Sequence, residues 1–400
     1  MNQETRQFIF DNKDADVFVI ALQSDRFPKV DMPLAIRQIT GKQKIKSKVP
    51  LFYNTEDILY PVQLSLEQSS SQSTAIYKST LCNGISLVDL TGGFGVDCYF
   101  MSQQFNHATY VERQEELCHL AHHNFKALNK DNIKVIHCET EVYLTTMEHV
   151  DWIFIDPARR SISGKKVVLL SDCEPDICSL YSLLLEKASQ IMIKLSPMMD
   201  TSAAIQYLQN TSEIHIISVE NECKEVLLIL NQSAQNNRKV KTINFGKNNK
   251  NQVFEYKLED ELTAEATIAT KVEKFLYEPN ASIMKSGAFK LIGNKFKINK
   301  LHKNTHLYTS NEFIEEFPGR VFEVINQWGN SKKELKDLVE NSPKANMSTR
   351  NYPIGAEELR KKLKIKDGGD IYLFACTLFD EQKVIIETIK PTDSKASKEV

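Results

Sequence analysis

The sequence lacks the cysteine patterns that bind zinc or form redox-active pairs. None of its eight cysteines belongs to a Cys-x-x-Cys pair, and Cys173 and Cys178 are too far apart in the sequence for a zinc knuckle. His119, His122 and His123 share one predicted helix, but no pattern of acids or cysteines joins them. We therefore expect reduced thiols, no metal site and a cytoplasmic protein.

Long apolar runs and an excess of charge of one sign are also missing. No window approaches the roughly 18 apolar residues that span a bilayer, and the polar N-terminus does not look like a secretion signal. The formal net charge of -2 argues against a globally basic nucleic-acid binder, although local basic patches stay possible. With 400 residues and 42% hydrophobic content, the chain can bury a core and form two or three domains. We expect no membrane contact.

From Leu87 onwards, short β-branched runs alternate with longer amphipathic segments. The predicted strands are SLVDL (86–90), HATYVE (107–112), IKVIH (133–137), DWIFID (151–156), QIMIKL (190–195), EIHIISVE (213–220) and KEVLLIL (224–230). Strands that alternate with helices predict an α/β fold with a doubly wound, Rossmann-like sheet. Too few residues separate the last two strands for a crossover helix, so we expect the seventh strand to be reversed.

The pattern predicts four parts along the chain. Residues 1–80 form a mostly helical N-terminal region, and residues 81–232 form the sheet domain. Two small α+β modules are expected at 238–315 and 320–392. The polar, asparagine-rich segment after Asn231 is interpreted as a linker or an exposed hairpin.

Three glycines follow the first strand within four positions, in LVDLTGGFGVDCYF (87–100). Gly92, Gly93 and Gly95 lie where this strand turns into a helix, so backbone amides and the helix N-terminus would face a ligand. Glycines at this point typically accompany a nucleotide-like cofactor at the carboxyl edge of the sheet. Taken alone, the pattern also fits a tight turn.

Acids near the ends of the first strands narrow the identity of the cofactor. Glu112 closes the second strand about seventeen residues after Gly95, where it can accept hydrogen bonds from both ribose hydroxyls of an adenosine. Glu139 or Thr140, after the third strand, would reach the adenine. Asp89 precedes the glycines and suits a ligand with an ammonium group, since it would repel a pyrophosphate. The pattern also departs from the G-x-G-x-x-G fingerprint of NAD sites, so it favours S-adenosylmethionine.

These features resemble the class I S-adenosylmethionine-dependent methyltransferases, over about residues 66–231. The whole chain is similar to a bacterial group of such proteins with a ferredoxin-like insert, here 238–315, and a C-terminal THUMP-like domain, here 320–392. The resembling segments are QSSSQSTAIYK, DPARR, KLSP, FLYEPNASIMKSGAF, LYTS, FPGR and STRNYP. The resemblance implies S-adenosylmethionine as cofactor. The residues expected to bind it are Asp89, Thr91, Gly92, Gly93, Gly95, Asp97, Glu112, Glu139, Thr140 and Asp156.

The target atom of a methyl transfer has two candidate interpretations. Methylation at pyrimidine C5 needs a cysteine nucleophile, and neither DPARR nor KLSP contains one. DPAR resembles the Asp-Pro-Pro-aromatic motif of enzymes that methylate exocyclic amines, in which the Asp156 side chain and the Pro157 carbonyl would accept the N–H bonds. Ala158 and Arg159 depart from that motif, although a guanidinium can stack on a base.

The second interpretation is a Lys-Asp-Lys-Glu tetrad like that of RNA ribose 2′-O-methyltransferases. Its members here would be Lys78, Asp156, Lys194 and Glu225, which the topology should bring to one rim of the sheet. Lys194 would be the base, with a pKa lowered by burial and a cationic neighbour. Alternatively, Lys194 and Glu225 form an ordinary salt bridge and Lys78 contacts the cofactor carboxylate. The sequence leaves the target atom open.

A basic stretch in the second half of the chain points to RNA as partner. No acid occurs between Pro279 and Asn311, and Phe289, Phe296 and Tyr308 interleave with the basic residues. The predicted phosphate-binding lysines are Lys285, Lys290, Lys295, Lys297, Lys300 and Lys303. THUMP domains bind RNA in the families that carry them, so the resemblance also implies RNA. The alternatives are a small-molecule or protein methyltransferase, a non-catalytic RNA-binding protein, and plain solvated lysines.

Overall fold

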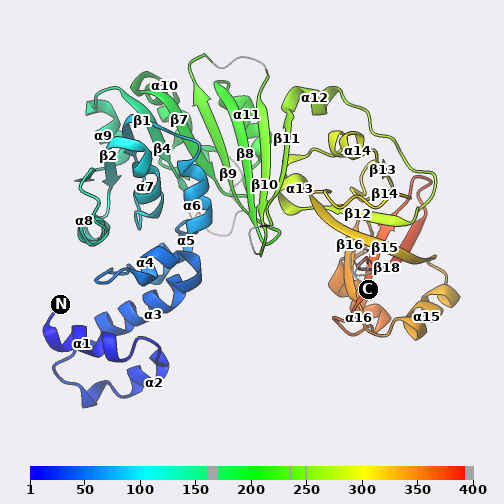
Figure 1. The fold of residues 1–400 in the computed structure, drawn as a ribbon, viewed down its shortest axis with the longest axis horizontal. Coiled ribbons are helices and arrows are strands. Elements are labelled where there is room, and N and C mark those ends of the chain that lie inside the picture. The colour runs from blue at the N-terminus through cyan, green and yellow to red at the C-terminus, as the bar shows by residue number, and fades with distance from the viewer. Residues whose placement is uncertain (160–169, 234–236, 248–249, 392–400) are drawn as a thin grey trace, which may run out of the picture. The chain divides into compact units, whose positions relative to one another are not determined.

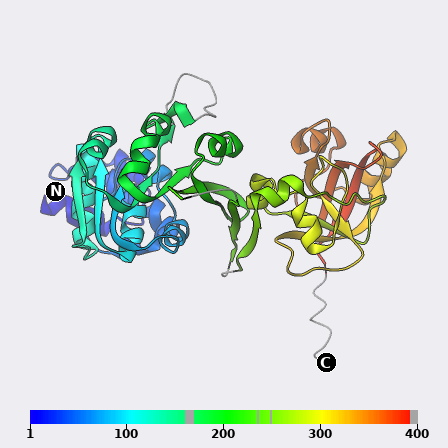
Figure 2. The ribbon, with the colours of Figure 1, turned by 90° about the horizontal axis from the view of Figure 1, so that it is seen from above.

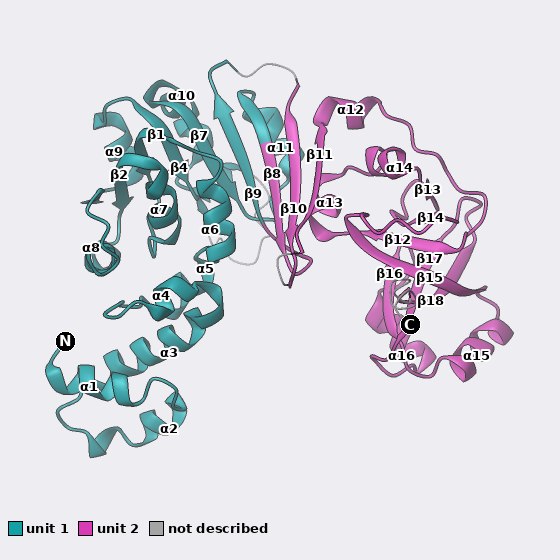
Figure 3. Ribbon diagram, in the orientation of Figure 1, with its two compact units in different colours: residues 1–213, 225–235 teal, residues 214–224, 236–400 magenta. Residues whose placement is uncertain are grey.

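The computed structural model describes residues 1–159, 170–233, 237–247 and 250–391. The chain divides into two compact units, which Figure 3 colours separately. Unit 1 comprises Met1–Glu213 and Glu225–Gln235, and unit 2 comprises Ile214–Lys224 and Asn236–Val400. Within the described residues, no helix is both long enough and apolar enough to cross a membrane.

Helices fill the first 80 residues, as the sequence predicts. They are α1 (Gln3–Asp11), α2 (Val17–Leu22), α3 (Met32–Lys48), α4 (Pro50–Asn54), α5 (Gln63–Gln68) and α6 (Gln72–Ser79). Several begin at a side chain that accepts a hydrogen bond from a free backbone N–H of the first turn, such as Asp31 for α3 and Ser71 for α6. The ring of Phe52 in α4 packs against Phe94 of the glycine loop, with centroids 5.4 Å apart. The N-terminal helices therefore support the loop that follows the first strand.

One sheet has nine strands in the order β11-β10-β8-β9-β7-β4-β1-β2-β3 (Figure 1). Their bounds are β1 (Gly84–Asp89), β2 (Phe105–Glu112), β3 (Ile133–His137), β4 (Val150–Ile155), β7 (Ala188–Leu195), β8 (Thr211–Val219), β9 (Glu222–Asn231), β10 (Lys239–Phe245) and β11 (Gln252–Lys257). The pairs β1–β2, β1–β4, β2–β3 and β4–β7 are parallel, whereas β9 is antiparallel to β7. The predicted reversed last strand is therefore confirmed.

Helices cover both faces of the parallel part of this sheet, which Figure 2 shows from above. They are α7 (Val96–Met101), α8 (Glu115–Ala127), α9 (Thr140–Thr146), α10 (Ile177–Lys187) and α11 (Thr201–Tyr207). The central strands are correspondingly buried, with Ile153, Ile155 and Ile193 fully inaccessible to solvent. Burial on both faces explains why these strands are continuous apolar runs without alternation. A short ribbon of β5 (Ala158–Arg159) and β6 (Cys173–Glu174) follows β4.

The polar segment after Asn231 contains a strand that the sequence did not indicate as part of this sheet. β10 pairs with β11 in antiparallel register, and both extend the nine-stranded sheet. The side chains that made this segment look like a linker are polar, but Val240 and Ile243 of β10 are buried. Val240 and Ile243 are three residues apart and lie on opposite faces of the strand, so no regular alternation indicated that a hairpin in this segment joins the sheet.

A seven-stranded sheet forms the rest of unit 2, in the order β13-β14-β12-β15-β18-β17-β16. Its strands are β12 (Phe275–Pro279), β13 (Asn299–Lys300), β14 (Tyr308–Ser310), β15 (Gly319–Trp328), β16 (Asn346–Arg350), β17 (Ile371–Thr377) and β18 (Lys383–Ile389). The helices of this unit are α12 (Leu258–Thr263), α13 (Ala281–Ser286), α14 (Leu291–Phe296), α15 (Lys332–Asn341) and α16 (Ala356–Leu363). The amphipathic helices α15 and α16 bury Leu338 and Leu359 in one apolar cluster with Leu373 and Ile385 of the sheet.

Candidate cofactor and catalytic site

The glycine loop after β1 is a closely packed turn with one open position. The Gly92 amide donates to the Val111 carbonyl (2.9 Å), and the Tyr110 hydroxyl donates to the Gly93 carbonyl (2.6 Å). A Cβ atom on Gly92 would lie 2.1 Å from the Tyr110 ring, so only glycine fits there. At Gly93 (φ +55°) the nearest heavy atom to such a Cβ is 3.8 Å away, a backbone oxygen of Thr91. The loop thus leaves space beside Gly93 and none beside Gly92.

Asp89, at the end of β1, is a buried carboxylate with an unused oxygen. Its side chain is about 1% exposed, and Oδ1 accepts from the Thr91 amide at 3.0 Å. Oδ2 is buried with no hydrogen-bond partner among the described residues. Burial raises the pKa of Asp89 well above its usual value. A cationic group beside Oδ2 would satisfy this oxygen, which fits the ammonium group of the predicted cofactor.

The residues predicted to bind the adenosine differ in their burial and in their hydrogen-bond partners. Glu112 is buried and braces the loop, since its two oxygens accept from the amides of Gly93 and Gln114, each at 2.9 Å. Thr140 is also buried and donates its hydroxyl to the Leu90 carbonyl at 2.6 Å. Glu139 is exposed immediately before α9. Of the two candidates for adenine recognition, Glu139 is therefore the accessible one.

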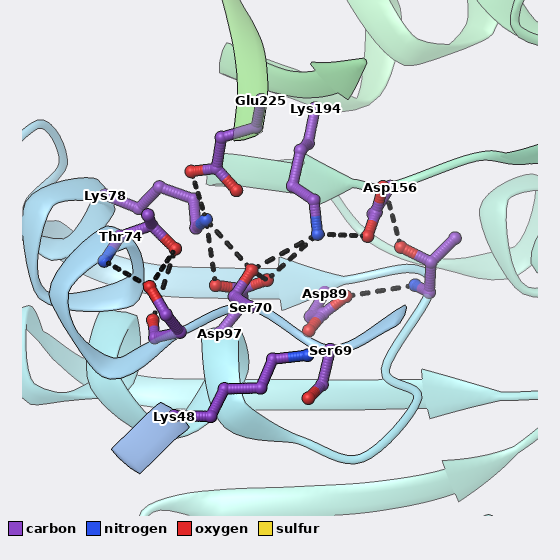
Figure 4. Close-up of polar contacts among 12 residues, drawn as sticks. Lys48, Ser69, Ser70, Thr74, Lys78, Asp89, Asp97, Asp156, Lys194 and Glu225 are labelled. Carbon is purple, nitrogen blue, oxygen red and sulfur yellow. Dashed lines mark hydrogen bonds and ion pairs between the residues drawn. The ribbon is translucent and has the colours of Figure 1, made fainter. Parts of the chain in front are cut away.

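A buried network of charged side chains lies next to this loop (Figure 4). Lys78 of α6 is fully buried, and its Nζ lies 2.6 Å from Glu225 Oε1 and 3.2 Å from Asp97 Oδ1. Lys194, at the end of β7, forms an ion pair with Asp156, and its Nζ is 3.5 Å from Asp97 Oδ2. The structure thus brings together the four residues of the proposed tetrad, with Asp97 between the two lysines.

Ser70 connects the two halves of this network, a role that the sequence did not reveal. Its hydroxyl lies 3.1 Å from Lys78 Nζ and 3.2 Å from Lys194 Nζ, and it donates to Asp97 Oδ2 at 2.7 Å. Ser70 was part of a resembling segment, QSSSQSTAIYK, but one serine in a serine-rich run carries no signal of its own. Asp97 was predicted to bind cofactor, whereas in the structure its carboxylate contacts Lys78, Lys194 and Ser70.

The charges of the network decide its protonation. Burial favours a neutral Lys194, but Asp156 and Asp97 outweigh that effect and raise the pKa of Lys194. Burial also acts on Asp97, where Lys78 and Lys194 prevail and lower the pKa. For Asp156, burial prevails over Lys194 and the pKa is raised. The expected lowering of the Lys194 pKa is therefore wrong for this arrangement, because carboxylates outnumber the cationic neighbour, whereas a role of Lys194 as base stays a prediction.

Accessibility separates the residues that can touch a substrate from those that hold the network. The side chain of Asp156 is 33% exposed, that of Lys194 11%, and those of Glu225 and Lys78 4% and 0%. The Asp156 amide donates to Thr91 Oγ1 at 2.7 Å, which fixes the start of DPAR against the glycine loop. Pro157 is buried directly after it. The side chain of Arg159 and residues 160–169 lie outside the described part of the chain.

The lysines predicted to bind RNA lie in unit 2 and differ in exposure. Lys295, Lys297 and Lys303 are exposed, and Lys285 and Lys290 are partly buried. Lys300 is buried, donates to the Lys303 carbonyl at 2.6 Å, and has a pKa lowered to about 8 by burial.

The aromatic residues of the same stretch belong mostly to the core. Tyr308 is fully buried and Phe296 packs in the same apolar cluster, while Phe289 stacks on His306 with centroids 3.6 Å apart. The prediction of free stacking platforms is therefore wrong for Tyr308. The aromatic residues of this stretch alternate because they fill a core, which looks the same in the sequence as a stacking surface.

The strand order with its reversed last strand, the glycine loop after β1 and the acid at the end of β2 define a class I methyltransferase fold. Comparison with known proteins adds the family. A ferredoxin-like domain family matches residues 275–318 and a THUMP domain-like family matches residues 319–388. The crystal structure of a "putative methyltransferase from Porphyromonas gingivalis W83" has a TM-score of 0.87 and 32% identity, covering 97% of this chain and 98% of that chain. This chain belongs to the same family, which combines a methyltransferase sheet with ferredoxin-like and THUMP-like domains.

Other solved structures match only part of the chain. M. capricolum TrmK in complex with S-adenosylhomocysteine has a TM-score of 0.32 and 12% identity, covering 40% of this chain and 68% of that chain. SMU.1697c, "a putative methyltransferase from streptococcus mutans" also in complex with S-adenosylhomocysteine, has a TM-score of 0.31 and 14% identity, covering 40% of this chain and 96% of that chain. No curated protein matches the chain.

Proposed function

We propose that this protein is an S-adenosylmethionine-dependent methyltransferase whose substrate is RNA. The observation that carries the cofactor assignment is the buried Asp89 oxygen without a hydrogen-bond partner, at the end of β1 beside the glycine loop. Leaving a buried carboxylate oxygen unpaired is unfavourable, so its presence indicates a cationic partner that binds there. The ammonium group of S-adenosylmethionine supplies that charge.

The remaining cofactor contacts follow from the same loop. The open space beside Gly93 lets a ligand approach the backbone, whereas Gly92 is occupied by the Tyr110 ring. Glu112 is held by two backbone amides, and Glu139 is the accessible acid near the expected adenine position. When bound, S-adenosylmethionine supplies an electrophilic methyl group. The chain itself has to bind and orient the two reactants and to accept a proton.

Asp156 is the best candidate for the residue that contacts the substrate atom. It is the most exposed carboxylate of the network, it follows β4 directly, and its raised pKa suits a group that accepts a proton. An exocyclic amine could donate to Asp156 and to the Pro157 carbonyl, as the resemblance implies. Lys194, kept charged by Asp156 and Asp97, would position Asp156 without taking a proton itself. We therefore favour a nitrogen target.

A ribose 2′-oxygen is the second candidate target. The observation in its favour is that Lys78, Asp156, Lys194 and Glu225 do meet in one network. In that mechanism Lys194 must lose its proton, which would require the substrate to displace Asp156 from it. Lys194→Arg distinguishes the two targets, because arginine keeps the charge but cannot act as a base. Retained transfer favours nitrogen, and lost transfer in a folded variant favours oxygen.

RNA as the substrate is supported by the match of a THUMP domain-like family and by exposed lysines of unit 2. The test is transfer of labelled methyl groups from S-adenosylmethionine to RNA, followed by digestion to nucleosides. We expect one labelled nucleoside with the wild-type protein and none with Asp156→Ala. Cofactor binding without label in any RNA fraction would instead favour a small-molecule or protein substrate. RNA binding without cofactor binding would indicate a non-catalytic RNA-binding protein.

A further inference from the structure

Three segments that are distant in the sequence meet in unit 2 around one buried acid. They are FLYEPN (275–280), FPGR (317–320) and STRNYP (348–353), and each contributes one charged residue. Glu278 comes from β12, Arg320 from β15 and Arg350 from the end of β16. Glu278 belongs to the part that matches a ferredoxin-like domain, and both arginines belong to the THUMP-like part.

Glu278 holds both guanidinium groups through separate oxygens. Its Oε2 accepts from Arg320 Nε at 2.7 Å and also from Arg320 Nη2, and its Oε1 accepts from Arg350 Nη2 at 2.7 Å. The Glu278 side chain is only 2% exposed. Arg320 and Glu278 are register partners in neighbouring strands. By contrast, β15, β18 and β17 separate β12 from β16 in the sheet order, so the Arg350 contact is no consequence of strand pairing.

The two arginines carry more positive charge than is required to neutralise Glu278. One arginine would neutralise Glu278, and the second leaves the three residues with a net charge of +1. Neither arginine has another carboxylate within 4.0 Å among the described residues. A buried ion pair is by itself a weak source of stability, so a second arginine needs another explanation.

Glu278 fixes the orientation of both guanidinium groups, while both arginine side chains are still partly exposed to solvent. The side chains of Arg320 and Arg350 are 46% and 33% exposed, although the acid that holds them is buried. Arg350 Nη1 donates to the Thr349 carbonyl at 2.9 Å, and its Nε is buried without a hydrogen-bond partner in the described part of the chain, so the exposed part of this side chain is the end of the guanidinium group. Guanidinium groups held in a fixed orientation lose little entropy when they bind a phosphate with two parallel hydrogen bonds.

We propose that Arg320 and Arg350, held by Glu278, bind a phosphate group of the RNA substrate. This inference rests on the proposed RNA methyltransferase function and assigns a phosphate contact to it. The site is distinct from the predicted lysine stretch of residues 285–303, which depends on long flexible side chains. A pair of arginines oriented by a buried acid is a better phosphate site, because its geometry exists before the ligand binds.

The test variant is Arg320→Gln in the full-length protein. Arg350 still neutralises Glu278 in this variant, so we expect it to fold, and a thermal melt checks this. The measurement is the affinity for end-labelled total bacterial tRNA and fragmented ribosomal RNA as a function of salt concentration. Loss of one phosphate contact should weaken binding about tenfold and reduce the slope of log K against log salt by about 0.7 to 0.9.

Lys336→Gln is the matched control, since it removes one positive charge from an exposed lysine of the same unit that pairs with Glu340. If Arg320→Gln binds both RNA probes as the control does, the inference is overturned, and the three residues only join the two matched domains. If the wild-type protein binds neither probe, the inference and the RNA part of the proposed function both fail. Binding of S-adenosylmethionine, measured on the same samples, tests the cofactor part separately.

Discussion

The position of Asp89 should stabilise the complex with a cationic ligand and destabilise the ligand-free protein. Burial raises the pKa of Asp89, and one of its oxygens is unpartnered among the described residues, so the charged form is in an unfavourable environment in the free folded protein. For an acid whose folded pKa is raised, stability falls as the pH rises through the interval between the unfolded and folded pKa values. The cost then persists at neutral pH. Residues of this kind are typical of binding sites.

Asp89→Asn should therefore weaken binding of the cofactor and stabilise the folded protein. Asparagine can still accept from the Thr91 amide but carries no charge. We expect S-adenosylmethionine affinity to fall at least tenfold, and the free energy of unfolding without ligand to rise by about 1 kcal/mol at pH 7. Calorimetric titration and thermal melts measure the two effects. The difference in melting temperature should shrink as the pH falls toward 3.8, the usual pKa of aspartate. Unchanged cofactor affinity would contradict the assignment of this loop.

Asp156→Asn should separate chemistry from cofactor binding. The substitution removes the exposed proton acceptor and the nearest carboxylate to Lys194, but it leaves Asp89 and the glycine loop intact. We expect methyl transfer to fall by at least about 100-fold while cofactor affinity changes little. Single-turnover transfer and calorimetry on the same preparation give both values. A variant that transfers methyl groups normally would remove Asp156 from the mechanism.

Ser70→Ala tests whether the network positions Asp156. Both lysines lose one hydrogen-bond partner, but each keeps a carboxylate, so we expect stability to fall by only about 1 kcal/mol. Transfer should fall with little change in cofactor affinity, because Lys194 is less firmly held. Comparison with Ser73→Ala, in the same serine run, controls for a general loss of α6 stability. Equal activity in both variants would leave Ser70 a purely structural residue.

The residue scale also shows what the sequence could and could not predict. Asp156, Lys194 and Glu225 lie at the ends of predicted strands and Lys78 on the helix before the first one, so topology alone predicted that they meet at one rim. Ser70 has no such signal, and the protonation of Lys194 depends on how many carboxylates surround it. The catalytic role of these residues stays a prediction.

At the scale of elements, the adjacent glycines Gly92 and Gly93 have different structural roles in the loop after β1. Gly92→Ala would push the Tyr110 ring away and disturb its bond to the Gly93 carbonyl, at a cost of about 1–3 kcal/mol in stability. Gly93→Ala meets no close atom and costs only the left-handed backbone strain of roughly 1–2 kcal/mol, but its Cβ enters the space expected for the ligand.

The two glycine variants should differ in the property that they lose, which is cofactor affinity for one and thermal stability for the other. At temperatures where both variants are folded, Gly93→Ala should lower S-adenosylmethionine affinity about tenfold or more through direct steric conflict, whereas Gly92→Ala should mainly lower the melting temperature. Calorimetry and thermal melts on the pair decide this. If the Gly93 variant binds normally, the open position beside the loop does not face the cofactor.

Elements with strong apolar patterns were predictable, and weakly patterned ones were not. β4, β7 and β9 contain continuous buried runs and stand out as apolar segments, whereas β10 and β11 mix polar and apolar residues on both faces, so the segment that contains β10 was interpreted as a linker or an exposed hairpin. Tyr308 shows that a clear sequence pattern can also suggest the wrong role for a residue. Its aromatic spacing fits a stacking surface, but only tertiary packing reveals that it is in the core.

At the scale of the whole molecule, one chain combines a methyltransferase sheet with ferredoxin-like and THUMP-like domains. The predicted boundaries at 81–232, 238–315 and 320–392 stay predictions. The sequence indicated the family through short motifs, but it could not show that Glu278, Arg320 and Arg350 meet, because no local pattern joins them.

The most direct test of the central claim is mass spectrometry of nucleosides from total RNA, comparing cells with and without the gene. We predict that one methylated nucleoside is lost in the deletion strain. The wild-type gene should restore it, whereas genes encoding Asp89→Asn or Asp156→Asn should not, at equal protein levels. A base-methylated nucleoside would support the nitrogen target, and a 2′-O-methylated one the alternative. An unchanged set of RNA modifications in the deletion strain would contradict RNA as the substrate.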